Sequence, residues 1–133
     1  MKTYGDVAEK AVELITAKSL PAFEAWKVAA KFVFPQSVAS QEKGCPRSAF
    51  LGLCAAGIVR GVPAGDYGKS GTGPNAQYAL AAAEIVRSTK NVVLLDKDFL
   101  WKQVLSIVGA EAGKVQNHQM EVVLRLAAKG LLT

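Results

Sequence analysis

The sequence has few of the residues from which metal sites and disulfide-rich folds are built. Its 133 residues include two cysteines and one histidine, and no run of apolar residues is long enough to span a membrane as a helix. One histidine excludes a histidine metal cluster, and two cysteines exclude a disulfide framework. The first residues contain no hydrophobic segment, so we expect no secretory signal and a cytoplasmic protein with reduced thiols.

What the chain does have is apolar content and a moderate excess of positive charge. Half of its residues are apolar, and 16 Lys+Arg against 11 Asp+Glu give a net charge of +5. This composition excludes a disordered chain, and the length suits one domain over residues 1–133. The basic residues are scattered, except over residues 43–70, where four of them accompany one acid. Such scattering is typical of a solvated surface, with a weak anion or nucleic-acid site over 43–70 as the second interpretation.

Apolar residues recur at helical spacing along most of the chain, which predicts an all-α bundle of five or six short helices. The helices are expected over residues 4–18, 21–34 and 46–59, from 75, from 96, and over 117–130. Expected N-terminal caps are a Thr3–Asp6 capping box and then Cys45, Asn75, Asp96 and Asn117, while Gly130 and Leu131 predict a Schellman ending. The faces expected to be buried include Phe23, Trp26, Ala30 and Val33 in the second helix, and Phe99, Leu100, Val104, Ile107 and Val108 in the fifth.

The longest irregular segment is expected from Arg60 to Pro74, with five glycines and two prolines. It contains Gly-Lys-Ser, but the first glycine of a Walker loop would fall at Pro63, and no strand precedes it. The loop can present backbone amides and Lys69 to a small anion, with Tyr67 as a stacking group. A plain connector explains the same composition. Residues 91–95 are also expected to form a connector, because one strand would have no partner.

The two cysteines lie in different surroundings. Cys45 is expected at a helix N-terminus between Lys43 and Arg47, where positive charge favours the thiolate. It is therefore a candidate nucleophile or redox sensor, although a small capping residue in Gly-Cys-Pro explains it as well. Cys54 fits the Cys-x-x-Gly-x-x-Arg spacing of cysteine-dependent phosphatases, yet it falls within a helical pattern, which favours a buried core thiol.

The only histidine, His118, is a candidate general base if folding brings it to Cys45. The alternative is that residues 117–119 are simply a polar helix start, with Asn117 as a candidate ligand-binding residue. No metal site is expected, because the two cysteines are nine residues apart on one helix and face opposite sides. The last helix resembles a winged-helix recognition helix, but no wing follows, so any nucleic-acid binding would be weak.

Several segments together are similar to a family of small bacterial proteins of unknown function. They include Tyr4-Gly5-Asp6-Val7-Ala8, residues 43–54 from Lys-Gly-Cys-Pro to Gly-Leu-Cys, Leu100-Trp101, and residues 117–123 followed by Gly-Leu-Leu. The resemblance extends over nearly the whole chain. It implies a bacterial, soluble, single-domain protein and transfers no catalytic residue.

The sequence therefore favours a helical binding or interaction protein without catalysis or cofactor. Its partner would be a second copy of the chain or another protein, with no membrane association. The rival hypothesis is a thiol-dependent enzyme or redox sensor centred on Cys45, assisted by Arg47, Lys69 and His118. Candidate ligand-binding residues are Arg47, Tyr67, Lys69 and Asn117. A weak nucleic-acid binding protein is the third hypothesis.

Overall fold

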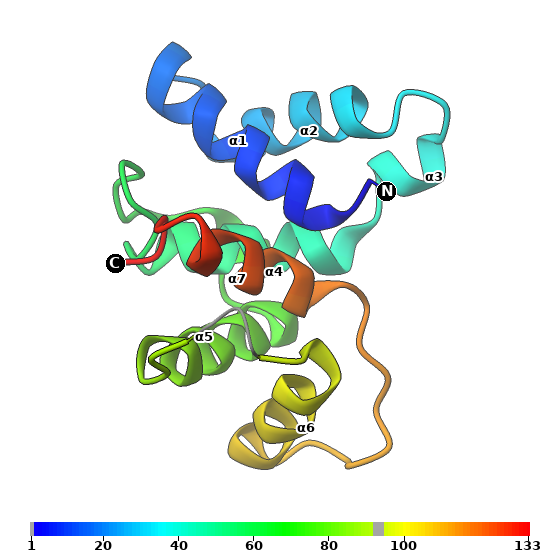
Figure 1. Cartoon of the computed structure of the whole chain (residues 1–133). Coiled ribbons are helices and arrows are strands. Elements are labelled where there is room, and N and C mark those ends of the chain that lie inside the picture. The colour runs from blue at the N-terminus through cyan, green and yellow to red at the C-terminus, as the bar shows by residue number, and fades with distance from the viewer. Residues whose placement is uncertain (1, 92–94) are drawn as a thin grey trace.

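A computed structural model of the chain (Figure 1) describes residues 2–91 and 95–133, without the side chains of Lys69 and Ser70. It confirms the all-α fold class. The long helices of the described part are α1 (Tyr4–Lys18), α2 (Ala22–Val33), α4 (Gly44–Ala55), α5 (Pro74–Arg87), α6 (Lys97–Val108) and α7 (Gln119–Ala128). A four-residue helix, α3 (Val38–Gln41), and a 3₁₀ turn, η1 (Gly68–Gly71), lie in the connections. The connector expected over 91–95 lies mostly outside the described residues.

The helices form three stacked layers (Figure 1), in which α1 and α2 pair above α4 and α7, and α5 and α6 lie below. The middle layer is in contact with both outer layers, through α1 with α7 and through α4 with α5. Large side chains without exposure fill the space between layers, including Trp26, Phe50, Leu51, Leu100 and Met120. The turn of the chain at α3 carries it from the upper layer to the start of α4. The starts of α1, α4 and α7 lie on the same side of the molecule (Figure 1).

Three of the expected helix ends are confirmed. Thr3 and Asp6 form a reciprocal capping box, in which the Thr3 N–H donates to Asp6 Oδ2 at 2.7 Å. The side chain of Asp96 accepts the Phe99 N–H at 3.0 Å. At the end of α7, Gly130 adopts φ +69° and the Leu131 N–H donates to the Leu126 carbonyl at 2.8 Å, a Schellman ending.

The expected cap at Cys45 is wrong. Helix α4 begins at Gly44 with Lys43 as the N-cap residue, so Cys45 lies inside the first turn. Pro46 tolerates this earlier start because the first N–H groups of a helix have no intrahelical partner in any case. The helix also ends at Ala55 rather than Val59, since Gly57 turns the chain at φ +77°.

The expected caps at Asn75 and Asn117 are also wrong. Gly73 precedes α5, whose first residue is Pro74, so Asn75 lies in the first turn. There its side chain accepts the Nε2–H of the buried Gln119 at 2.8 Å. The N-cap residue of α7 is His118, in the left-handed region at φ +71°, and it makes no side-chain cap. The Asn75 side chain thus pairs with a distant segment instead of its own helix end, whereas at residue 117 the helix begins two residues later, at Gln119.

Part of the expected core is exposed. Phe23 on α2 is 45% exposed, and Phe99 and Ile107 on α6 are 56% and 63% exposed. Phe99 lies on the side of α6 opposite to its buried residues, and Ile107 and Val108 lie at the end of the helix. The buried side is that of Leu100, Trp101, Val104 and Leu105.

The C-terminal residues close the fold against the segment that follows α4. Val59 and Leu132 form an isolated antiparallel bridge, and the Arg60 N–H donates to the Leu131 carbonyl at 2.8 Å. The Arg60 side chain also donates to the Gly130 carbonyl at 2.9 Å. Within the described residues, no helix is long and apolar enough to cross a membrane.

Candidate functional site

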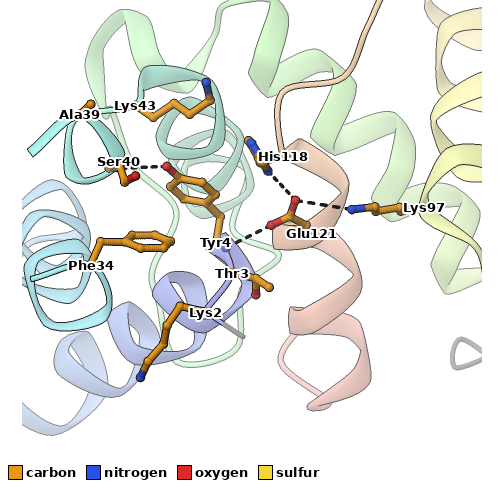
Figure 2. A pocket seen from close by; sticks show the side chains of 10 residues that line it. All are labelled: Lys2, Thr3, Tyr4, Phe34, Ala39, Ser40, Lys43, Lys97, His118 and Glu121. Atoms are coloured by element: carbon orange, nitrogen blue, oxygen red, sulfur yellow. Dashed lines mark hydrogen bonds and ion pairs between the residues drawn. The ribbon is translucent and has the colours of Figure 1, made fainter. Parts of the chain in front are cut away.

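A pocket of about 510 Å³ lies where the start of α1 meets α3 and the starts of α4, α6 and α7 (Figure 2). We call it the Tyr4 pocket. Its lining residues are Lys2, Thr3, Tyr4, Phe34, Ala39, Ser40, Lys43, Lys97, His118 and Glu121. Its volume is in the range of pockets that hold small molecules. Because these residues come from five separate segments, the pocket exists only in the folded chain.

Three rings form one continuous wall of the Tyr4 pocket. The Tyr4 ring centroid lies 5.0 Å from that of Phe34 and 4.9 Å from that of His118. The Tyr4 hydroxyl donates to the Ser40 carbonyl at 2.9 Å, which fixes the ring against α3. Burial raises the pKa of the Tyr4 phenol, and the negative charge of the nearby Glu121 raises it further. The phenol therefore stays neutral and serves as a fixed surface.

Glu121 is the polar centre of the opposite wall. Its Oε1 accepts the backbone N–H of Tyr4 at 3.2 Å, at the start of α1. Its Oε2 lies 2.5 Å from His118 Nδ1 and 3.8 Å from Lys97 Nζ. Its side chain is 15% exposed. Both oxygens of the only acidic residue in the lining are therefore engaged within the protein.

The charges around the pocket do not cancel. Lys2, Lys43 and Lys97 contribute three positive charges to the lining against the single negative charge of Glu121. Figure 2 shows the side chains of Lys2 and Lys43 on opposite sides of the Tyr4 ring. Lysine ammonium groups on flexible stems attract anions without imposing one geometry. The pocket thus combines a positive rim with the wall of three rings.

A close contact between α1 and α7 holds the two walls in register. A Cβ atom on Gly5 would lie 2.8 Å from Arg125 Cβ, so only glycine allows this approach. Arg125 Nη1 donates to Asp6 Oδ1 at 2.7 Å and to Glu9 Oε1 at 3.0 Å. Burial alone would raise the pKa of Asp6, but the hydrogen bonds from Arg125 and Thr3 outweigh it, and the pKa lies below its ordinary value. Asp6 is therefore ionised at neutral pH and ties α1 to α7 beside Tyr4.

Of the candidate catalytic residues, His118 lines the Tyr4 pocket and Cys45 is not among its lining residues. Cys45 is half-buried in the first turn of α4, beside the lining residue Lys43. Cys54 is buried in the core, and burial raises the pKa of its thiol to about 12. Cys54, the first residue of the Cys-x-x-Gly-x-x-Arg spacing, is therefore a core residue.

The candidate ligand-binding residues lie apart from one another. The Arg47 guanidinium stacks over the Phe23 ring at 5.3 Å. Tyr67 lies in a different hollow, formed with the α1–α2 turn, and its hydroxyl donates to the Pro63 carbonyl at 2.9 Å. Asn117 is exposed, and its backbone N–H donates to Gln119 Oε1 at 2.6 Å. The side chain of Lys69 lies outside the described residues.

Of the residues that line the pocket, His118 alone is a sequence-based candidate, and Tyr4, Lys97 and Glu121 are among those that were missed. Their contacts join positions up to 117 residues apart in the chain, so no local spacing connects them. The only sequence signal is that Tyr4, Lys43, His118 and Glu121 all lie within segments that carry the family resemblance. Within the part of the chain that the structure describes, no three His, Cys, Asp or Glu residues are placed to hold a metal ion.

The chain belongs to the family of unknown function DUF6979, whose model matches residues 1–133. The resemblance to an uncharacterised family is thereby confirmed, and the match covers every segment of the Tyr4 pocket. No curated protein and no solved structure matches the chain. Any function therefore has to be argued from the pocket itself.

Proposed function

We propose that the protein is a binding module without catalytic activity, and that the Tyr4 pocket holds one small organic anion with an apolar group. The observation that carries this proposal is the pairing of a positive rim with a wall of three rings. The rim attracts the charged end of the ligand, and the rings cover its apolar end. The open shape and the moderate volume suit a molecule of metabolite size.

The state of Glu121 supports an anionic rather than a cationic ligand. A carboxylate that is free to face the ligand would favour a cation. Here the Tyr4 N–H, His118 Nδ1 and Lys97 Nζ already surround the two carboxylate oxygens. A cation would have to displace them and would also meet Lys2 and Lys43 on the rim.

The chemistry of the lining supports binding rather than catalysis. The charged groups of the lining are three lysines, which hold an anion by attraction, and Glu121, whose oxygens are engaged; the Tyr4 phenol is tied to Ser40. Of the two thiols, Cys54 is buried in the core and Cys45 lies outside the lining. The thiol-enzyme hypothesis would need Cys45 to reach a substrate from the first turn of α4.

The cellular setting is part of the same proposal. We propose a bacterial cytoplasm as the compartment, where small organic anions are abundant. Self-association is a separate prediction, and light scattering on the purified chain tests it.

Calorimetric titration with phenylacetate tests the proposed site. Phenylacetate is a small carboxylate with an aromatic ring, so it matches the positive rim and the wall of three rings. We expect the double variant Lys2→Gln/Lys43→Gln to bind about tenfold more weakly, since each exposed ion pair contributes up to about 1 kcal/mol. The loss should diminish at high salt concentration.

A matched control separates the pocket from the overall charge. Lys27 and Lys102 are exposed and do not line the pocket, so Lys27→Gln/Lys102→Gln removes the same net charge elsewhere. This control should bind phenylacetate like the unmodified protein. Equal losses in the two double variants, or no binding by the unmodified protein, would overturn the proposal.

A further inference from the structure

The hydrogen bond between His118 and Glu121 fixes which imidazole nitrogen carries the proton. A carboxylate can only accept hydrogen bonds, and Glu121 Oε2 lies 2.5 Å from His118 Nδ1. Nδ1 must therefore carry a hydrogen atom. In the neutral ring this leaves Nε2 without a hydrogen, as a hydrogen-bond acceptor.

The acceptor nitrogen is available to a ligand. Figure 2 shows that it points away from Glu121, and the His118 side chain is 43% exposed at the edge of the pocket. The other strong acceptor of the lining, Glu121, has both of its oxygens engaged. His118 Nε2 is thus the uncharged acceptor that a ligand in this pocket meets beside the lysines.

We propose that the ligand carries a hydroxyl group next to its anionic group, as a 2-hydroxy carboxylate with an apolar substituent does. This inference rests on the proposed function and names the class of ligand. The carboxylate lies against the lysines of the rim, the hydroxyl donates to His118 Nε2, and the substituent covers the Tyr4 and Phe34 rings. Charge and hydroxyl are adjacent in such a molecule, and the lysines and His118 line the same pocket.

The same arrangement disfavours the corresponding amino acid. An ammonium group could also donate to Nε2, but it would bring a positive charge among Lys2, Lys43 and Lys97. Sites for amino acids usually offer that ammonium a free carboxylate, and Glu121 has no free oxygen. A hydroxyl supplies the hydrogen bond without the charge.

Three probes that differ in one group test this inference on the unmodified protein. Mandelate, phenylacetate and phenylglycine share a ring and a carboxylate and carry a hydroxyl, a hydrogen and an ammonium group on the adjacent carbon. Calorimetry at pH 8 should show the better enantiomer of mandelate binding about fivefold more tightly than phenylacetate, the typical effect of one added hydrogen bond. Phenylglycine should bind more weakly than phenylacetate.

The outcomes separate this inference from the proposed function. If none of the three probes binds, the proposed function itself fails. If phenylacetate binds and mandelate binds no more tightly, the anion site stands and the hydroxyl inference is wrong. If phenylglycine binds most tightly, the pocket is an amino-acid site, which also contradicts the inference.

Two variants assign the preference to His118. Glycine tolerates the left-handed backbone at this position, so His118→Gly removes the acceptor without strain at φ +71°. It should bind both ligands more weakly, because one of the three rings is lost, and it should bind mandelate and phenylacetate with equal affinity. In Glu121→Gln the hydrogen atom is no longer forced onto Nδ1, because an amide can donate as well as accept a hydrogen bond. This variant should therefore bind mandelate with a smaller advantage over phenylacetate. A preference for mandelate that persists in His118→Gly would overturn the assignment.

Discussion

The interface between α4 and α5 and the interface between α1 and α7 both depend on a glycine, and they differ in almost everything else. A Cβ atom on Gly52 of α4 would lie 2.4 Å from the Cβ of Ala76 on α5. A Cβ atom on Gly5 of α1 would lie 2.8 Å from Arg125 Cβ on α7. Around Gly52 the two helices pack through small apolar side chains, whereas around Gly5 they are joined by ion pairs and hydrogen bonds.

The two interfaces differ in their expected roles, one in stability and the other in binding. The α4–α5 interface is buried and apolar, so it contributes mainly to the free energy of folding. The ion pairs of the α1–α7 interface are partly exposed, with 27% exposure for Arg125 and 31% for Asp6, and such pairs contribute little to stability. That interface instead places Tyr4 against Glu121 and so shapes the pocket. Variants in the two interfaces should therefore separate folding from binding.

The largest effect is expected at the apolar interface. Gly52→Val inserts a branched side chain where even a Cβ atom would overlap Ala76, so the free energy of unfolding should fall by about 3 kcal/mol. Urea denaturation followed by circular dichroism measures the change. The fraction that stays folded should bind phenylacetate with unchanged affinity.

A second glycine provides the control for this change. A Cβ atom on Gly113 would meet nothing within 4 Å, so Gly113→Val should alter stability by less than about 0.5 kcal/mol. A loss of affinity in folded Gly52→Val, or an unchanged stability, would show that the two interfaces do not divide the two roles.

A smaller change in stability is expected at the polar interface. Arg125→Met keeps much of the side-chain volume but removes the partner of Asp6 and Glu9. Because these groups are partly exposed, the free energy of unfolding should fall by only about 1 kcal/mol. The affinity for phenylacetate should nevertheless decrease, since α1 and α7 no longer hold Tyr4 and Glu121 in register.

The pH dependence of this variant identifies Asp6 as the group concerned. In the folded protein the pKa of Asp6 lies below its ordinary value of 3.8, so its ion pair stabilises the fold above that pH. The stabilisation is lost as the pH falls below 3.8 and through the lowered pKa. The stability difference between the unmodified protein and Arg125→Met should therefore be full at neutral pH and shrink in acid. A difference that stays constant down to pH 2 would exclude Asp6.

The fold could largely be predicted from the sequence because its signals are local. The capping box at Thr3, the cap at Asp96 and the ending at Gly130 each depend on residues within a few positions of one another. The expected cap at Asn75 failed because its side chain pairs with Gln119 of a distant segment, and the cap at Asn117 failed because α7 begins at Gln119 with His118 as its N-cap residue. The buried side of α6 was predicted in part, through Leu100 and Val104, whereas Phe99 lies on the opposite side of the helix.

The candidate site could be predicted only in part. His118 stands out in the sequence as the single histidine, and it does line the pocket. Its partner Glu121 looks like an ordinary acidic residue in the first turn of a helix. Its role depends on the start of α1 and on Lys97 at the start of α6, and tertiary packing alone brings these together. The spacing of residues along the sequence pointed instead to the two cysteines and to the glycine-rich loop.

Amide chemical shifts test directly whether the Tyr4 pocket binds a small organic anion. Phenylacetate is titrated into the ¹⁵N-labelled protein while the two-dimensional ¹H–¹⁵N spectrum is recorded. We expect saturable shifts that are largest for Tyr4, Lys43, His118 and Glu121, with Gln77 and Gln103 of the α5–α6 layer unaffected. Shifts concentrated on that layer, or no saturable shifts at all, would show that the Tyr4 pocket is not the anion site.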